Sequence, residues 1–279
     1  MKSGSSKFDF SVPLVPMESG EKIESGPSRV EVLYHAMTII WRNHRRVTPE
    51  IMDEPDVAAA EHVLALDGLR RINRSSHAAD NVARPIIAMA RQKNLKQLSM
   101  LDVACGGGDV PVGVALRARR AGVEIDLTLL DRSATALRYA AAKADRMGIA
   151  CRCVPSDCLT QRHALHFDVV TNSLFLHHLR EPSQVVEFLR NAREISRRLV
   201  VINDLRRCRD GWIGAWIGSR ILSRSGIVHH DAPASARAAW TVEELAGFAA
   251  EAELNGVKIA RCWPWRMLLV WEAQEGGGA

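Results

Sequence analysis

Apolar residues along this chain follow two spacings, one typical of buried strands and the other of amphipathic helices. Strands are predicted to end near residues 105, 131 and 154 and to cover 167–173 and 199–203, and helices are predicted at 134–148 and 183–195. This alternation predicts a parallel sheet with helices on both faces. The last apolar runs, 257–263 and 266–272, are joined through Pro264 and predict a closing hairpin.

The pattern divides the chain into three parts. Residues 1–28 are rich in Ser, Gly, Lys, Glu and Pro without periodicity, which predicts a disordered tail. Residues 29–94 have helical spacing and predict an N-terminal helical cap, with breaks near Pro49, Pro55 and Pro85. Residues 95–279 then form the α/β domain, with an insertion at about 205–240 that we expect to build a substrate pocket.

A glycine-rich segment follows the first strand of that domain. Residues 100–109 read Met-Leu-Asp-Val-Ala-Cys-Gly-Gly-Gly-Asp, and a helical pattern begins directly afterwards. Glycines let the backbone approach a ligand closely, and the helix start offers unpaired N–H groups. The segment therefore favours a nucleotide-type ligand site, although an ordinary strand-to-helix turn has the same composition.

Asp131 ends the next predicted strand, about 20 residues after the glycines, where a carboxylate suits two ribose hydroxyls. Its alternative role is to cap the helix that begins near Ser133. Pro111 stands where a dinucleotide fingerprint starting at Gly106 would need its third glycine, which argues against NAD or FAD. A ligand with adenine and ribose but no phosphates fits better.

Four segments together resemble the class I S-adenosylmethionine-dependent methyltransferases, especially the branch of ubiquinone and menaquinone biosynthesis. They are Leu-Asp-Val-Ala-Cys-Gly-Gly-Gly at 101–108, Leu-Leu-Asp-Arg-Ser at 129–133, Pro-Ser-Asp-Cys-Leu at 155–159, and Phe-Asp-Val-Val-Thr-Asn-Ser-Leu-Phe-Leu-His-His-Leu at 167–179. The resemblance covers about residues 95–275 and implies a seven-stranded, mostly parallel, doubly wound α/β sheet of the Rossmann-like kind. Ala104 stands where that family usually has its first glycine, a small change that we expect to leave binding intact.

The same resemblance implies roles in holding S-adenosyl-L-methionine. Asp102 and the glycines Gly106, Gly107 and Gly108 would hold its methionine part, and Asp131 its ribose. Asp157 would bind the adenine amino group, and Asn172 would line the backbone side of the cofactor. The predicted cofactor site is completed by the neighbouring residues Ala104, Arg132 and Cys158.

Methyl transfer is an in-line displacement, so the acceptor must be aligned, and a base helps when it is a hydroxyl or an acidic carbon. His177 and His178 close the fourth strand, where cofactor and acceptor should meet, and one of them is expected to pack structurally. His229, His230 and Asp231 lie in the insertion and would supply a base with its orienting carboxylate. The alternative for these three is a polar loop with Asp231 as a turn or cap residue.

Residues 211–222 of the insertion are apolar and place Trp212 and Trp216 on one helical face. This pattern fits a core-packing helix, or the wall of a pocket for a lipophilic or aromatic acceptor with at most peripheral membrane contact. Trp240 would join that wall.

Composition restricts the alternatives. The chain has 279 residues, of which 47% are hydrophobic, and a formal charge of +5. Its basic residues are scattered in short clusters with few aromatics beside them, so we do not expect nucleic acid as a partner. Its six cysteines lack zinc spacing, and we expect reduced thiols and no metal site. Neither a secretory signal nor a membrane span is recognisable, which predicts a cytoplasmic protein.

The sequence therefore predicts an S-adenosylmethionine-dependent methyltransferase that acts on the oxygen of a small hydrophobic phenolic, quinone-like or polyketide-type acceptor. Carbon methylation of a similar ring is an alternative, as is a cofactor-binding accessory protein without catalysis. The sequence leaves the oligomeric state open.

Overall fold

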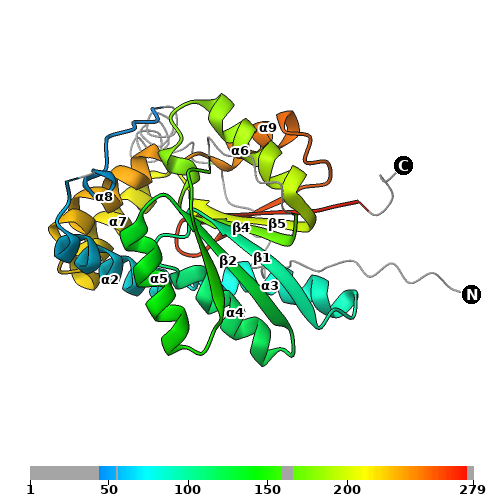
Figure 1. Ribbon diagram of the computed structural model, residues 1–279. Coiled ribbons are helices and arrows are strands. Elements are labelled where there is room, and N and C mark those ends of the chain that lie inside the picture. Colours follow the sequence, from blue (N-terminus) through cyan, green and yellow to red (C-terminus); the bar gives the residue numbers. More distant parts are fainter. Residues whose placement is uncertain (1–43, 55, 159–165, 275–279) are drawn as a thin grey trace, which may run out of the picture. The chain divides into compact units, whose positions relative to one another are not determined.

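A computed structural model describes residues 44–54, 56–158 and 166–274, all within one compact unit that spans 38–279 (Figure 1). The predicted tail at 1–28 and the first part of the predicted cap, 29–43, lie outside the described residues. The strands are β1 (Gln97–Val103), β2 (Glu124–Asp131), β3 (Cys151–Pro155), β4 (Phe167–Ser173), β5 (Ser196–Leu205), β6 (Lys258–Cys262) and β7 (Arg266–Glu272).

These strands form one sheet in the order β3-β2-β1-β4-β5-β7-β6. The five strands from β3 to β5 pair in parallel, and β7 pairs antiparallel with both β5 and β6. The sheet confirms the predicted doubly wound α/β fold, including the closing hairpin. The helices are η1 (Ile51–Asp53), α2 (Ala59–Ser75), α3 (Ala78–Gln92), α4 (Asp109–Arg120), α5 (Ala134–Arg146), η2 (Leu176–His178), α6 (Pro182–Ile195), α7 (Arg209–Leu222), α8 (Gly226–Ala238) and α9 (Val242–Glu251).

Helices cover both faces of the sheet, and the strand sequences show why. Leu98 and Met100 of β1 pack into a core with α3, α4 and α5, whereas Leu101 and Val103 pack into a second core with α6 and α9. Successive strand residues point to opposite faces, so a nearly continuous apolar strand is buried on both sides. The helices thereby fix the carboxyl ends of the parallel strands, from which the site is built.

Pro85 lies in the interior of α3, whereas Pro111 lies in the first turn of α4. Pro85 was expected to break the predicted helical region 29–94, but α3 continues through it. The actual break is at His77, which has a φ of 51°. Pro111 lies in the first turn of α4, where the missing N–H costs no helical hydrogen bond. The glycine-rich segment therefore runs directly into a regular helix.

The elements η1, α2, α7 and α8 form a cap over the carboxyl ends of the strands, and α2, α7 and α8 lie side by side (Figure 1). A small apolar cluster joins Ala65 of α2 to Ile227 and Val228 of α8. The predicted insertion at 205–240 is thus mostly two helices. His229, His230 and Asp231 lie on α8, which corrects the expectation of a polar loop.

Candidate active site

A cavity of about 1010 Å³ lies between the carboxyl ends of the strands and the cap. One end is lined by residues that directly follow β1, β2 and β3, including the glycine-rich segment. The other end is lined by the segment around η1, by η2 and by α7 and α8. Parallel α/β sheets bind ligands at this edge, so the cavity is the candidate active site.

The glycine segment is shaped by its own backbone and by the next strand. Gly106 has a φ of 50°, and its N–H donates to the carboxylate of Asp131 at 2.8 Å. A Cβ at Gly106 would meet no protein atom within 4 Å, so it would project into open space at the cavity. Gly108 caps α4, where a Cβ would lie 2.8 Å from the Cβ of Ala140. Gly106 thus leaves room in the cavity, whereas Gly108 allows α4 and α5 to pack.

Lys143 supports the glycine segment from behind. Its side chain is buried, and its amine donates to the carbonyl oxygen of Gly107 at 2.9 Å and pairs with Asp109. Burial and the like charge of Arg70 lower the pKa of Lys143 to about 8. A buried cation is costly unless it is paired, so this ion pair fixes the loop in one position.

Asp131 occupies the place that the sequence predicts, at the end of β2 beside the glycines. One carboxylate oxygen accepts from Gly106 and the other from the N–H of Ser133, at 2.8 Å each. A carboxylate has about four acceptor positions, so both oxygens retain capacity for hydroxyl groups. The cap of α5 is made by the Ser133 side chain, which accepts from Ala136. The ribose role of Asp131 stays a prediction that this geometry favours.

Asp102 is a buried carboxyl group in the cavity wall. Its hydrogen-bond partner is the hydroxyl of Thr171 on β4. Burial raises the pKa of Asp102 to about 7, against the opposing effect of that hydrogen bond. Ala104 also lines the cavity and has a φ of 53°, a conformation that glycine adopts more readily. The alanine therefore keeps the backbone shape that a glycine would give at this position.

The remaining predicted cofactor residues divide into two groups. Arg132, Asp157 and Cys158 line the cavity after β2 and β3. Burial raises the pKa of the Cys158 thiol to about 12, so the thiol stays neutral. Asn172 is fully buried in β4, its amide donates to the carbonyl of Val103 at 2.7 Å, and it is not among the described lining residues. The sheet places its neighbour Ser173 at the cavity instead.

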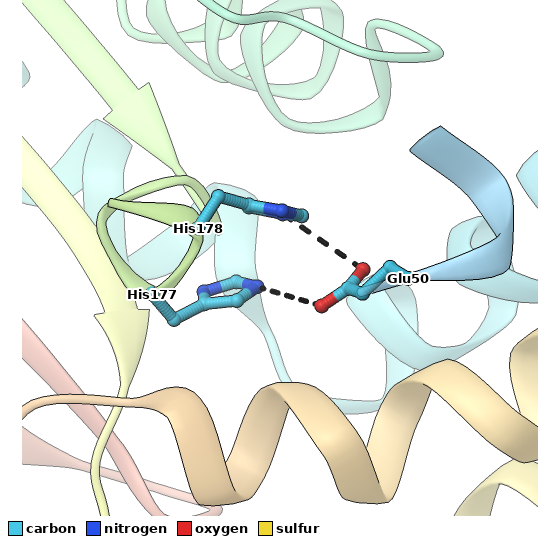
Figure 2. Close-up of side chains that lie close together, drawn as sticks. All are labelled: Glu50, His177 and His178. Carbon is cyan, nitrogen blue, oxygen red and sulfur yellow. Dashed lines mark ion pairs between the residues drawn. The ribbon is translucent and has the colours of Figure 1, made fainter. Parts of the chain in front are cut away.

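Two histidines meet a glutamate at the other end of the cavity (Figure 2). Nε2 of His177 lies 3.8 Å from Glu50 Oε1, and Nε2 of His178 lies 3.9 Å from Glu50 Oε2. The opposite ring nitrogen of His177 is 2.7 Å from Asp204 at the end of β5, and that of His178 is 3.1 Å from Asp53 in η1. Each imidazole is therefore oriented by one carboxylate and directed toward Glu50.

Nearby carboxylates raise the pKa of His178. Burial alone would lower its pKa, but the hydrogen bond with Asp53 and the negative charges of Glu50, Asp53 and Asp204 outweigh burial and raise the pKa to about 9. Asp53 also pairs with Arg132 at 3.0 Å. Asp53 therefore contacts both His178 and Arg132, the residue that follows Asp131.

Arg45 attaches the segment before η1 to the part of the cavity that carries His177 and His178. Its guanidinium donates to the carbonyls of His177, Leu179, Arg180 and Ala238 and lies 3.5 Å from the ring centre of Trp240. It thereby fixes the chain just before Glu50 against η2 and the end of α8. Bonds to several carbonyls from one planar group favour a single orientation of both partners.

The structure gives the second predicted histidine pair another environment. Asp231 accepts from the backbone N–H groups of Ile51 and Met52 at 3.0 Å each, so its carboxylate holds η1 in place. His230 contacts Asp231 and is 47% exposed, and His229 contacts the carbonyl of Ser223. None of these three is among the described lining residues. A catalytic role for them stays a prediction that the geometry does not favour.

The expected tryptophan wall is built from different tryptophans. Trp240 is buried and donates to the carbonyl of Leu176, while Trp216 is 45% exposed on the outer face of α7. Trp263 and Trp265, from the turn between β6 and β7, line the cavity. Gly214 on the inner face of α7 permits this, because a Cβ there would lie 2.1 Å from Trp265. Membrane contact through α7 stays a prediction.

Sequence reasoning missed several cavity residues. Glu50, Asp53 and His62 line the cavity from the segment before β1, and Asp204, near the end of β5, contacts the lining residue His177. Burial lowers the pKa of His62. A polar Asp directly after an apolar strand was a signal for Asp204, since the strand ends carry the other site residues. The residues before β1 gave no comparable signal.

Comparison with known proteins agrees with this geometry. Residues 100–198, which include the glycine segment, Asp131 and the first histidine pair, match the model of the methyltransferase domain family. This part of the chain is similar to a methyltransferase domain. This match confirms the predicted enzyme class, an S-adenosylmethionine-dependent methyltransferase of class I, while the ubiquinone and menaquinone branch stays a prediction. No curated protein matches the sequence.

Solved structures show the same fold at low identity. The plantazolicin methyltransferase BpumL, bound to a substrate analogue and S-adenosylhomocysteine, is 15% identical with a TM-score of 0.57, over 77% of this chain and 96% of its own. The Synechocystis magnesium protoporphyrin IX methyltransferase with bound S-adenosylmethionine is 12% identical with a TM-score of 0.50, over 90% and 100%.

A third solved structure, an O-methyltransferase of Nostoc punctiforme, is 17% identical with a TM-score of 0.49 over 68% of this methyltransferase. The chain spans 56% of the length of that protein. Within the described ranges, none of the helices combines the length and the apolar character needed to cross a bilayer.

Proposed function

We propose that this methyltransferase transfers the methyl group of S-adenosyl-L-methionine to the oxygen of a small hydrophobic phenolic, quinone-like or polyketide-type acceptor. The observation that carries the proposal is that one cavity joins the glycine segment to the polar side chains of Glu50, His177 and His178. An acceptor enclosed in this way is a small molecule rather than a nucleic acid.

The strand end of the cavity supports the cofactor assignment. Asp102 is a buried acceptor for an ammonium group, and Asp131 retains acceptor positions for ribose hydroxyls. Asp157 follows β3, on the far side of Asp131 from Asp102, because β2 lies between β3 and β1 in the sheet. The three carboxylates thus follow the order in which methionine, ribose and adenine are joined in the cofactor.

The cap end supports a hydrophobic acceptor with one polar group. Apolar side chains of α2, α7 and the β6–β7 turn line the cavity, including Leu69, Leu222, Trp263 and Trp265. An aromatic ring between these side chains would bury apolar surface at roughly 25 cal/mol per Å². The only strongly polar partners needed are then those that meet its hydroxyl group, and the Glu50 and histidine cluster supplies them.

The reaction requires alignment and loss of one proton. The acceptor oxygen attacks the methyl carbon, the bond from that carbon to sulfur breaks, and S-adenosylhomocysteine is the product. The hydroxyl proton passes to the Glu50 carboxylate or to a water molecule at the polar end of the cavity. The apolar walls keep water away from the reacting methyl group, which strengthens the electrostatic contacts there.

Labelled methyl transfer tests the proposal. The full chain is incubated with methyl-labelled S-adenosylmethionine and a panel of alkylated phenols, hydroxyquinones and resorcinols, and the product is examined by NMR to locate the methyl group. We expect a methoxy signal. A methyl group on ring carbon would establish the carbon-methylating alternative, and calorimetric binding of S-adenosylhomocysteine without turnover on any panel member would support the accessory alternative.

A further inference from the structure

We propose that Glu50, His177 and His178 bind one divalent transition-metal ion, zinc or iron(II), at the polar end of the cavity. One ligand atom from each residue lies within 4.8 Å of the other two. Figure 2 shows both imidazoles directed toward the glutamate. Two imidazoles and one carboxylate form a ligand set that these ions prefer.

The separations indicate a gap between the three side chains. The two distances of 3.8 and 3.9 Å between imidazole nitrogens and Glu50 oxygens are too long for hydrogen bonds. Ligands about 2.0 to 2.2 Å from a tetrahedral ion are roughly 3.4 Å apart. These two separations are therefore within about 0.5 Å of the value expected around an ion, and the remaining separation between ligand atoms is at most 4.8 Å.

Each proposed ligand is also held by a second partner. Nδ1 of His177 faces Asp204 at 2.7 Å, and Nδ1 of His178 faces Asp53 at 3.1 Å. The hydroxyl of Ser235 donates to Glu50 at 2.5 Å. Histidines that bind metals commonly donate their second ring N–H to a carboxylate, which directs the other nitrogen to the ion. Both histidines here have such a carboxylate partner, as metal-binding histidines commonly do.

The local charge also suits a cation. Glu50, Asp53 and Asp204 bring three carboxylates to two imidazoles, and the cation paired with Asp53 is the largely exposed Arg132. All three proposed ligands line the cavity, so a fourth coordination position would face the acceptor. Three protein ligands with one open position are typical of catalytic metal sites.

The role of the ion rests on the proposed function. A hydroxyl oxygen of the acceptor would take the open position, its proton would pass to water, and the resulting oxyanion would attack the methyl carbon. The spacing of cysteines and histidines in the sequence predicted no metal site. Glu50 lies in a different segment from the histidines, and only the cap brings it to them.

Metal titration without cofactor or acceptor tests the site directly. The full chain is stripped with a chelator, and Zn²⁺ binding is measured by calorimetry and by metal content after gel filtration. Co²⁺ is used as a spectroscopic probe. We expect one equivalent of Zn²⁺ and a visible cobalt band. Failure of the stripped chain to bind either ion at tenfold excess would overturn the proposal.

Variants separate this site from adventitious binding. Glu50→Gln and His178→Ala are each expected to weaken Zn²⁺ binding by about a hundredfold, and Asp53→Asn by about tenfold. His230→Ala removes a histidine from the same cap and is the matched control, with Zn²⁺ affinity unchanged. Equal Zn²⁺ affinity in all four variants would overturn the site.

S-adenosylhomocysteine binding by each variant reports that the fold is intact. If a variant does not fold, the shift of the His177 and His178 imidazole resonances on adding Zn²⁺ to the parent chain decides the question, and unshifted resonances would contradict the proposal. Because the titration uses no acceptor, failure of the proposed methyl transfer and failure of the metal site are independent outcomes.

Discussion

The two ends of the cavity are assembled in different ways. At the cofactor end, the lining residues come from short segments that directly follow β1, β2 and β3. At the acceptor end, the pairing of β4 with β5 brings His177 and Asp204 together, whereas Glu50 reaches them only through the packing of the cap. The first end depends on the order of strands in the sheet, and the second on contacts between the cap and the sheet. Substitutions should therefore affect one end without the other.

The largest expected effect is at the glycine segment. Gly106→Val places a branched side chain where no protein atom lies within 4 Å, at a φ of 50°. We expect S-adenosylhomocysteine affinity, measured by calorimetry, to fall at least a hundredfold. The strained backbone should also lower the free energy of unfolding by about 1 to 2 kcal/mol.

Gly122→Val is the matched control for this strain. Gly122 has a φ of 81° and open space around it, and it lies in the turn before β2, away from the cavity. A similar loss of stability with unchanged cofactor affinity is expected. Tight cofactor binding by Gly106→Val would contradict the assignment of this end.

The acceptor end is tested through Arg45. Arg45→Gln removes a guanidinium that donates to four backbone carbonyls, so the segment that carries Glu50 loses its attachment to η2. We expect kcat/KM for the acceptor to fall roughly thirtyfold and the free energy of unfolding to fall by about 2 kcal/mol. S-adenosylhomocysteine affinity should stay within twofold.

Arg46→Gln serves as the control for Arg45, because the neighbouring Arg46 is exposed. It should leave kcat/KM and stability unchanged. If Arg45→Gln reduced cofactor affinity as strongly as turnover, the two ends would not be independent.

A smaller effect is expected from pH. The carboxylate form of Asp102 is the one that attracts the cofactor ammonium, and burial raises its pKa to about 7, opposed by the Thr171 hydrogen bond and assisted by the charge of Asp131. The charged fraction therefore rises with pH through 7. We expect the Kd for S-adenosylhomocysteine to be about tenfold weaker at pH 6 than at pH 8. The dependence should disappear in Asp102→Asn, and a flat profile in the parent chain would refute this role.

The smallest effect is expected at the second histidine pair. His230 is about half exposed on α8, and the described cavity lining does not include it. Turnover of His230→Ala should remain within twofold of the parent at neutral pH. A hundredfold loss, with intact cofactor affinity, would restore this pair as the source of the base.

The comparison also explains how much of the fold and site could be predicted from the sequence. Strand β4 has the predicted bounds and α6 begins one residue early, because apolar periodicity reflects burial directly. Gly106 and Asp131 were placed together because the ends of adjacent parallel strands meet at one edge. Local pattern and sheet topology were enough for the cofactor end.

The acceptor end depended on information that no local pattern carries. Glu50 precedes a single turn of helix and has no periodic context, and its position follows from the contacts of Arg45 and Asp231 with distant backbone atoms. The adjacency of His230 and Asp231 suggested a catalytic pair, and the two side chains do contact each other, but the carboxylate also holds two N–H groups of η1 and neither residue is among the described lining residues of the cavity. Long-range packing decided both cases.

The inner face of α7 has a consequence for the size of the acceptor. The ring of Trp265 fills the space beside Gly214. Gly218 lines the same cavity, but a Cβ there would meet nothing within 4 Å. Larger side chains at position 218 would shorten the available space without displacing any neighbour. A series of Gly218→Ala, Gly218→Val and Gly218→Leu would then act as a ruler, and the longest alkyl chain that each variant still accepts would decrease along it.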